Sequence, residues 1–386
     1  MKSKIIDILL IVNLVFKKLI YNDNFLNEAF VLVTASDEKH YIYLKQLIKN
    51  YEKLIKSRHF TKFIIYDIGL SNKQIQEILN FNFIDLRKFP FEKYPEFYSL
   101  RLPEHNNKIG GFAWKPAIIN TLKEEKFTNV IWLDSATIFD KKIIFFKYLI
   151  AYYGFGSFYS TGSISDWTHS YVIEKLDLKN NFEVLQSPNL LAGVTGFSFR
   201  KQEGVLTLEK WNNYSSQKDL IFPKNSSTSN HRHDQSLLSI THWLSTKRKL
   251  PSNTELFGIK IQNWPNKILF FYDEKKGIRE KLLKKYYFES TTTNSRCKIL
   301  ILFNVESLKK IPIRLIFRKK VLLFITNTDQ LNLLNRYYIK KNFLQIYLDN
   351  GCKNINNYDY NIIDFQYDEV DKIIEKEYKI EFYGKE

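Results

Sequence analysis

Three short segments of the chain consist largely of apolar residues, and each is followed directly by polar side chains. They are 29–34 (AFVLVT), 62–66 (KFIIY) and 129–133 (NVIWL). Such runs are typical of strands in a parallel sheet that is covered by helices on both faces. Helical patterns separate them, at 41–51, after Ser71 and at 116–125, and a further short strand is expected at 81–86. Strands that alternate with helices predict an open α/β sheet.

Polar groups gather where the predicted strands end. They are Thr34 and Ser36 after the first strand, Asp67 after the second, and Asp134 with Ser135 after 129–133. In open α/β sheets, ligands bind beyond the carboxyl ends of the strands. We therefore expect the functional site at this edge of the sheet.

Polar stretches divide the chain into parts. Residues 1–27 are predicted to form an N-terminal amphipathic helix, residues 28–289 the α/β domain, and residues 297–386 a small C-terminal α/β unit. The stretch 289–296 (ESTTTNSR) predicts a linker, and the aperiodic stretch 214–230 predicts a surface loop. Four strands are expected in the C-terminal unit, at 298–303, 321–326, 344–348 and 360–365, with helices at about 329–341 and at the terminus.

The N-terminal segment 1–20 (MKSKIIDILLIVNLVFKKLI) allows three interpretations. It can lie in a membrane interface with Lys2, Lys4, Lys17 and Lys18 facing lipid phosphates. It can instead pack on its own domain or on a partner, or act as a signal anchor. The first two interpretations predict a cytoplasmic protein that is peripheral at a membrane or free of it, and the third predicts the secretory pathway.

The charge of the chain is strongly positive, with 58 Lys and Arg against 41 Asp and Glu, a formal net charge of +17. An anionic ligand, a membrane surface or a nucleic acid would suit this charge. A bias toward A/T-rich codons, which favour Lys, Asn, Ile, Phe and Tyr, would also produce it. No motif of a nucleic-acid-binding fold is present, so nucleic acid is not expected as the partner. The two cysteines have no zinc-ligand spacing.

The segments 112–119 (FAWKPAII) and 130–136 (VIWLDSA) form the clearest motif. Pro116 suits the first turn of a helix, and Trp114 and Lys115 then lie where that helix begins. An anion such as a diphosphate is favoured there. Asp134 follows an apolar strand, where its oxygens could hold a divalent cation. The alternative is a solvated Lys115, a core Trp114 and an Asp134 that caps the next turn.

Together with three other segments, this motif resembles the GT-A glycosyltransferases, the nucleotide-diphospho-sugar transferases. The matching pieces are YDIGLS (66–71), FAWKPAII (112–119), WLDSA (132–136), LAGVTGF (191–197) and HRHDQS (231–236). The resemblance covers about residues 28–250 and is nearest to a branch found in animals and bacteria with WKP, LDS and HRxDQS motifs. It implies a Rossmann-like mixed sheet flanked by helices.

The resemblance also implies a D-x-D motif that binds a metal and the diphosphate of the donor. Asp134 takes the first position, but Ala136 stands at the second, so the motif reads Asp134-Ser135-Ala136. Mn²⁺ or Mg²⁺ would then need a ligand from elsewhere, such as His231 or Asp234. Without a metal, Lys115 would carry more of the phosphate charge.

Further site residues follow from the same resemblance. Thr34, Ser36 and Asp67 would line the nucleotide pocket, and Trp114, Lys115, Asp134 and Ser135 would bind the rest of the donor. Gly193, Gly196, Asp166 and Trp167 would line the sugar or acceptor pocket, and Asp234 would be a general base or metal ligand. The alternatives are strand packing for the glycines, core packing for Trp167 and a helix cap for Asp234.

These features predict a glycosyltransferase, hexosyl or related, that moves a sugar from a nucleotide-diphosphate sugar to a glycan, lipid or protein acceptor. The product would be a surface polysaccharide, a glycolipid or a glycoprotein glycan. Two alternatives remain open: a non-catalytic binding protein with the same fold, and a basic protein that binds a membrane surface or nucleic acid.

Overall fold

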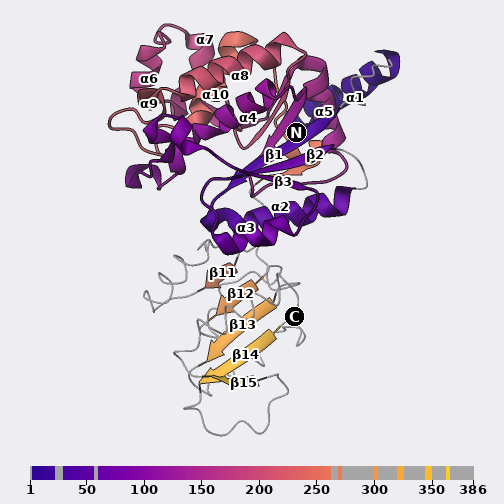
Figure 1. Cartoon of the computed structure of the whole chain (residues 1–386), viewed down its shortest axis with the longest axis vertical. Coiled ribbons are helices and arrows are strands. Elements are labelled where there is room, and N and C mark those ends of the chain that lie inside the picture. Colours follow the sequence, from indigo (N-terminus) through magenta and orange to yellow (C-terminus); the bar gives the residue numbers. More distant parts are fainter. Residues whose placement is uncertain are drawn as a thin grey trace. The chain divides into compact units, whose positions relative to one another are not determined.

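A computed structural model describes residues 2–21, 29–55 and 60–261, together with five strands of the C-terminal part. Contacts divide the chain into two compact units, Met1–Asn263 and Trp264–Glu386 (Figure 1). The predicted linker at 289–296 lies outside the described residues.

A six-stranded mixed sheet with the order β3-β2-β1-β4-β9-β6 forms the centre of the first unit. The strands are β1 (Phe30–Ser36), β2 (Lys62–Asp67), β3 (Ile84–Lys88), β4 (Asn129–Leu133), β6 (Phe155–Gly156) and β9 (Val194–Ser198). The first four in this row pair in parallel, whereas β9 runs antiparallel to β4 and β6 antiparallel to β9. The predicted mixed sheet flanked by helices is confirmed.

Helices cover both faces of this sheet. They are α1 (Lys2–Tyr21), α2 (Tyr41–Leu54), α3 (Asn72–Leu79), α4 (Trp114–Glu124), α5 (Ile143–Tyr153), α6 (Ser170–Lys175), α7 (Phe182–Leu185), α8 (Gln202–Ser215), α9 (Lys218–Ile221) and α10 (Asp234–Ser245). Alternate residues of β1 point to opposite faces. Val31 and Val33 join a core with α4, α8 and α10, whereas Phe30 and Leu32 join a core with α2 and α5.

Short elements complete the first unit. Two small antiparallel pairs join β5 (Ile138–Phe139) to β10 (Ile259–Lys260) and β7 (Tyr159–Ser163) to β8 (Pro188–Leu190). Short 3₁₀ turns fill much of the connection from β3 to α4, ending with Ile109–Phe112. This connection carries the chain to the edge where β1 and β4 end.

Local sequence signals explain several boundaries. Ser71 caps α3, because its hydroxyl accepts from the Gln74 N–H while the Gln74 side chain accepts from the Ser71 N–H. Pro116 lies in the first turn of α4, where its missing N–H leaves no hydrogen bond unmade. The loop predicted at 214–230 is wrong in part: α8 extends to Ser215 and α9 occupies 218–221. Leu220 and Ile221 of α9 are fully buried, which holds this segment on the core.

The described part of the second unit is a parallel sheet with the order β11-β12-β13-β14-β15. The strands are β11 (Ile268–Phe271), β12 (Ile299–Leu302), β13 (Lys320–Ile325), β14 (Leu344–Asp349) and β15 (Ile362–Phe365). The last four confirm the predicted strands, and β11 was not predicted. The predicted helices of this unit lie outside the described residues.

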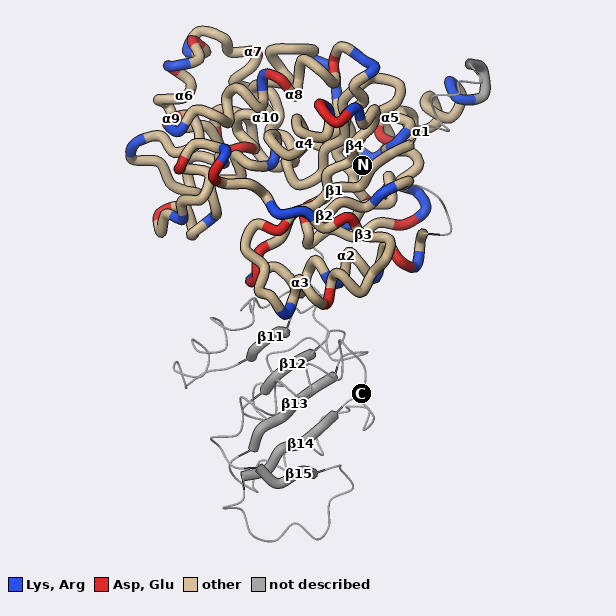
Figure 2. Tube along the Cα trace, in the orientation of Figure 1, with Lys and Arg blue, Asp and Glu red and all other residues tan. Residues whose placement is uncertain are grey.

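The charged residues of the first unit are spread along its trace. Figure 2 shows Lys and Arg interspersed with Asp and Glu over helices and loops alike. Within the residues that the structure describes, none of the helices is long and apolar enough to span a lipid bilayer.

Candidate functional site

The register of the sheet brings the predicted strand ends to one edge. Ser36 of β1 pairs with Asp67 of β2, and Val33 of β1 pairs with Trp132 of β4. Asp134 follows β4 directly and its N–H donates to the Gly193 carbonyl (2.8 Å). The start of β9 therefore lies against the end of β4, and the site forms where these segments meet the beginnings of α4 and α10.

A buried ammonium group lies at the centre of this edge. Lys115 Nζ is 3.3 Å from Asp134 Oδ1 and 3.2 Å from Asp234 Oδ2. It also donates to the Ala192 carbonyl at 3.2 Å. Lys115 and Asp234 are each only 2% exposed, whereas half of the Asp134 side chain is exposed. The structure thus brings together three of the predicted residues, and only Asp134 offers its carboxylate to solvent.

In this cluster, burial and the neighbouring opposite charges shift each pKa in opposite directions. Burial disfavours the ammonium of Lys115, but the carboxylates of Asp134 and Asp234 outweigh burial and raise the pKa of Lys115. Burial also raises the pKa of Asp234 to about 6, against the opposing charge of Lys115. A buried charge is tolerated when it is paired, so Lys115 is held charged by its two neighbours.

Aromatic rings surround the ammonium. Lys115 Nζ lies 5.2 Å from the ring centroid of Phe112 and 5.6 Å from that of Trp132, within range of cation–π attraction. The Trp132 indole N–H donates to Asp134 Oδ1 (2.8 Å) and fixes that carboxylate. Trp114 is 3% exposed and donates to the Ile109 carbonyl, so it packs in the core, as the alternative interpretation expects.

The two glycines of LAGVTGF have different surroundings. A Cβ at Gly193 would lie 2.6 Å from Asp134 Oδ2, so only glycine lets that carboxylate approach the chain. A Cβ at Gly196 would lie 2.0 Å from Ile150 Cδ1 of α5. Gly193 is therefore part of the site, whereas Gly196 serves the packing of β9 on α5, which corrects its assignment to the sugar pocket.

The histidines of HRHDQS are buried and neutral. His231 accepts from the His169 N–H through Nδ1 (3.4 Å) and donates from Nε2 to the Leu220 carbonyl (2.9 Å). Because both ring nitrogens have protein partners, we do not retain His231 as a metal ligand. Burial lowers the pKa of His231 to about 3 and that of His233 to about 2.

His233 holds an uncommon backbone conformation directly before α10. Its φ is +52°, which few non-glycine residues adopt. The Nε2 atom of His233 lies 2.9 Å from His105 Nδ1, and these two rings pack edge to face. His233 is the residue that precedes α10, and Asp234 is the first residue within it, so Asp234 is not the helix cap. The turn at His233 directs Asp234 toward Lys115.

Two cations that the sequence analysis did not select lie at the border of the site. Lys108 Nζ lies 5.4 Å from the centroid of the same Phe112 ring that Lys115 approaches. The central carbon of the Arg232 guanidinium lies 3.8 Å from the ring centroid of Trp167. Burial lowers the pKa of both Lys108 and Arg232. Among the described residues, neither has a carboxylate within ion-pair distance, unlike Lys115. The signal that could have revealed them is the position of Lys108 just before FAWKPAII and of Arg232 within HRHDQS.

Trp167 lies beside the start of α10. Its carbonyl accepts from the Arg232 N–H and from the Ser236 hydroxyl, and its indole donates to the Thr161 carbonyl. Asp166 is exposed and accepts from the Ser163 N–H (2.7 Å). The predicted acceptor loop is thus attached to the HRHDQS segment through Trp167, while Asp166 stabilises the turn of the loop itself.

The first two strand ends form a separate part of the edge. The Asp67 carboxylate accepts from the N–H groups of Gly69 and Leu70, so it stabilises a turn. The Ser36 hydroxyl donates to the Asp37 carbonyl, and the Thr34 hydroxyl is buried without a hydrogen-bond partner. Asp37, which was not predicted, adds a buried carboxylate here.

Asp37 is held by Arg101 and His40. Its Oδ2 atom is 2.9 Å from Arg101, and its Oδ1 atom is 2.5 Å from His40 Nδ1. Burial opposes ionisation, but these partners overcome it and hold the pKa of Asp37 well below its ordinary value. Arg101 pairs with Asp37 near the end of β1, and 42% of its side chain is exposed.

The donor set does not fit a divalent cation between the carboxylates. The Lys115 ammonium already lies within 3.3 Å of both Asp134 and Asp234. Position 136 is alanine, and His231 uses both of its ring nitrogens. Across the described ranges, no group of three or more His, Cys, Asp or Glu residues is arranged to hold a metal ion.

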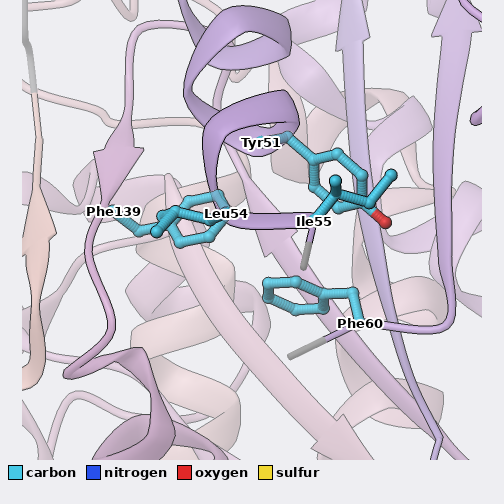
Figure 3. Close-up of a pocket in the computed structure, with 5 residues that line it drawn as sticks. All are labelled: Tyr51, Leu54, Ile55, Phe60 and Phe139. Atoms are coloured by element: carbon cyan, nitrogen blue, oxygen red, sulfur yellow. The ribbon is translucent and has the colours of Figure 1, made fainter. Parts of the chain in front are cut away.

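An apolar pocket elsewhere in the first unit is separate from this site. Figure 3 shows its lining, which is formed by Tyr51, Leu54, Ile55, Phe60 and Phe139. These residues come from α2, the chain before β2 and the strand β5. None of the charged residues of the site lines it, and it offers little chemistry for a polar substrate.

Comparison with known proteins gives distant likenesses. A family model described as a protein of unknown function, DUF1647, matches residues 5–119. No curated protein matches the sequence. Among solved structures, the galactosyltransferase LgtC in complex with donor and acceptor sugar analogs has 16% identity, covering 54% of this chain and 69% of that chain, with a TM-score of 0.34.

Two further solved structures are similar at the same level. The mannosyltransferase Ktr4p from S. cerevisiae has 11% identity over 55% of this chain and 65% of that chain, with a TM-score of 0.38. Mouse xyloside xylosyltransferase 1 has 8% identity over 68% of this chain and 94% of that chain, with a TM-score of 0.37. Because identities and TM-scores are low, the strand order described above is the support for the fold class.

Proposed function

We propose that the first unit transfers a sugar from a nucleotide-diphosphate sugar to a glycan, lipid or protein acceptor. The observation that carries this proposal is the position of the Lys115 ammonium between Asp134 and Asp234 at the carboxyl edge of the sheet. Beside it lie a half-exposed carboxylate and two cations that have no carboxylate partner among the described residues. Such a site suits a substrate that has hydroxyl groups at one end and a diphosphate at the other.

Asp134 is the group that we assign to the reacting hydroxyl. Of the two carboxylates beside Lys115, it is the one with an exposed side chain. The acceptor oxygen forms a bond to the anomeric carbon while the bond from that carbon to the phosphate oxygen breaks. The acceptor proton passes to Asp134, and the electron pair leaves with the nucleoside diphosphate.

Lys108 and Arg232 are the groups that we assign to the diphosphate. Both are partly buried cations, and both lack a carboxylate partner among the residues described. The charge that develops on the leaving diphosphate would be stabilised by preorganised cations at this border. The Lys115 ammonium, which has two carboxylates and a carbonyl as partners, is less free to bind an anion.

Asp234 acts through Lys115 in this proposal. It is 2% exposed and its carboxylate faces the ammonium, so it does not reach an acceptor hydroxyl. This changes the predicted role of Asp234 from a general base to a positioning residue, because it holds Lys115, which in turn holds Asp134. The proposed reaction uses no metal, since the ammonium lies where a cation would bridge the carboxylates.

Release of nucleoside diphosphate from a panel of sugar nucleotides tests the proposal. We expect the purified full chain to turn over at least one donor, with EDTA leaving the rate unchanged. Asp134→Asn should abolish turnover. Asp177→Asn is the matched control, because Asp177 is exposed and has a φ of +52°, which asparagine accepts.

Three results would overturn parts of this proposal. Donor binding without turnover would favour a non-catalytic binding protein with the same fold. Full activity in Asp134→Asn would remove Asp134 from the reaction. Loss of activity in EDTA with recovery in Mn²⁺ or Mg²⁺ would restore the metal that the resemblance implies.

The two cations are tested separately. Lys108→Gln and Arg232→Gln should each raise the KM for the donor about 10- to 100-fold, as expected for a hydrogen bond to a charged group. Lys93→Gln is the control, because Lys93 is exposed in the same connection between β3 and α4. Unchanged donor KM values in both variants would exclude these residues from the diphosphate site.

A further inference from the structure

The N-terminal helix α1 is attached to the first unit through a buried carboxylate. Asp7, only 2% exposed, accepts hydrogen bonds from the Ser252 N–H (3.1 Å), the Ser252 hydroxyl (3.0 Å) and the Asn253 N–H (2.8 Å). Two turns further along the helix, Leu14 is 2% exposed and lies in the core. The helix packs on α5 (Figure 1). One face of α1 is therefore fixed by Asp7 and Leu14.

The opposite face of α1 is apolar and exposed. Of the eleven large apolar side chains that are strongly exposed in the described residues, six lie on this one helix. They are Ile5 (54%), Ile6 (62%), Ile8 (44%), Leu9 (62%), Val12 (58%) and Phe16 (60%). With about 3.6 residues per turn, these positions fall on one side of the helix, away from Asp7 and Leu14.

This arrangement differs from that of an ordinary surface helix, because α1 is apolar on both its docked side and its outward side. A helix on a globular protein normally turns its apolar face to the core and its charged face to water. Here Leu10, Ile11 and Leu14 pack on the core on the docked side, and the outward side carries the six exposed apolar side chains. A contiguous apolar surface of this kind marks a site of interaction with a partner or a membrane.

Lysine and tyrosine side chains flank the apolar face. Lys4 is exposed in the first turns of α1. Near the other end, Lys17 Nζ lies 3.8 Å from the ring centroid of Tyr152, whereas Lys18 donates to the buried Tyr148 hydroxyl on the docked side. Tyrosine and lysine are the residues that anchor proteins at the level of lipid headgroups, where one end of the side chain is apolar and the other is polar.

We propose that the exposed face of α1 inserts into the interface of an anionic membrane, with the helix lying parallel to the surface. The cationic residues at both ends of the helix meet the phosphates of the lipid, while Ile5, Leu9 and Phe16 enter the acyl boundary. A second copy of the chain is disfavoured as the occupant, because the lysines at the ends of one helix would meet those of the other. The structure shows α1 packed on its own domain, and the proposal adds membrane contact through the face that this packing leaves exposed.

Vesicle sedimentation of the full chain tests this proposal. We expect binding to vesicles of phosphatidylcholine with phosphatidylglycerol, and weaker binding to phosphatidylcholine alone. The triple variant Leu9→Gln, Val12→Gln and Phe16→Gln should lower the partition coefficient at least about tenfold, since it removes three inserted side chains. Glutamine is a good helix former, so α1 should remain helical.

A matched control removes exposed apolar side chains elsewhere. Leu79 (58% exposed, on α3) and Phe182 (70% exposed, on α7) are replaced by glutamine in a double variant, which should bind vesicles like the wild type. If the triple variant fails to fold, as judged by circular dichroism, the single variants Leu9→Gln and Phe16→Gln replace it and should each lower binding.

Three outcomes would overturn the proposal: no binding of the wild type to anionic vesicles, equal loss of binding in the control, or unchanged binding in the triple variant. A wild-type dimer that dissociates in the triple variant, with no vesicle binding, would show that a second copy covers α1. Because binding is measured without substrate, none of these outcomes depends on glycosyl transfer.

Discussion

Lys115 Nζ lies 3.2 Å from Asp234 Oδ2, and both side chains are almost completely buried. Breaking such a pair leaves one charge in the interior without a partner. We expect Lys115→Gln to lower the free energy of unfolding by about 3–5 kcal/mol, measured by urea denaturation. Lys123→Gln, which removes a partly exposed pair with Glu209 from the same helix, should cost at most about 1 kcal/mol. Equal losses in the two variants would contradict the importance of the buried pair.

Asp234 should make stability depend on pH. Burial raises its pKa from 3.8 to about 6, so the folded state holds the proton more tightly than the unfolded state. Its contribution to stability is therefore largest below 3.8 and falls as the pH rises through about 6. Asp234→Asn lacks this titration, so the stability of the wild type relative to this variant should decrease across that range. A constant difference in melting temperature from acid to neutral pH would contradict the raised pKa.

The same titration should affect turnover. Protonation of Asp234 removes one of the two charges that hold Lys115 in place. We expect an acid limb in the profile of kcat/KM with an apparent pKa near 6, and we expect that limb to shift or vanish in Asp234→Asn. A purely structural Asp234 would lower stability in the variant but leave the shape of the pH profile unchanged.

The two glycines of β9 and the turn before it should respond differently to alanine. Gly193→Ala places a Cβ 2.6 Å from Asp134 Oδ2, so it should reduce turnover about tenfold or more with little effect on stability, because Asp134 is half exposed. Gly196→Ala places a Cβ 2.0 Å from Ile150 Cδ1 and should lower the free energy of unfolding by about 1–3 kcal/mol. Thermal melts and initial rates on both variants test this assignment. A loss of stability in Gly193→Ala together with a loss of turnover alone in Gly196→Ala would contradict it.

Removal of the Asp7 carboxylate should loosen α1 without unfolding the sheet. Asp7→Ala leaves the Ser252 and Asn253 N–H groups without their acceptor, at a cost of about 1–3 kcal/mol in the docking of the helix. Hydrogen exchange should therefore accelerate in α1 while the core strands keep their protection. Asn13→Ala, at an exposed position of the same helix, is the control and should leave exchange unchanged. Loss of protection in β1 and β4 would show that Asp7 stabilises the whole unit.

Much of the sheet could be predicted because its strands are short apolar runs with clear ends. Strand β4 (Asn129–Leu133) has the predicted bounds, and α10 begins within HRHDQS, at Asp234. The segment at 214–230 was harder, because the apolar residues that fix it, Leu220 and Ile221, lie in a polar stretch and are buried only by tertiary packing.

The sequence motifs predicted the three residues of the Lys115 cluster, but not what each of them does. The motifs identified Lys115, Asp134 and Asp234, whose proximity the structure shows. Burial could not be read from the motifs, so a fully buried Asp234 was expected to act as a base. Lys108 lies outside the motifs and Arg232, although part of HRHDQS, was given no role there; their position beside the site depends on a turn at His233 and on the 3₁₀ segments before α4.

The Lys115 cluster joins three distant parts of the chain, since its members lie on α4, after β4 and on α10. A nascent or truncated polypeptide that stops before Asp134 would have to bury an ammonium group with neither counterion in place. Closing the long loop between Lys115 and Asp234 costs entropy before this contact can form. The Lys115 ammonium is therefore fully paired only when both carboxylates are in place, so the proposed site and the stable interior of this unit depend on the same contacts.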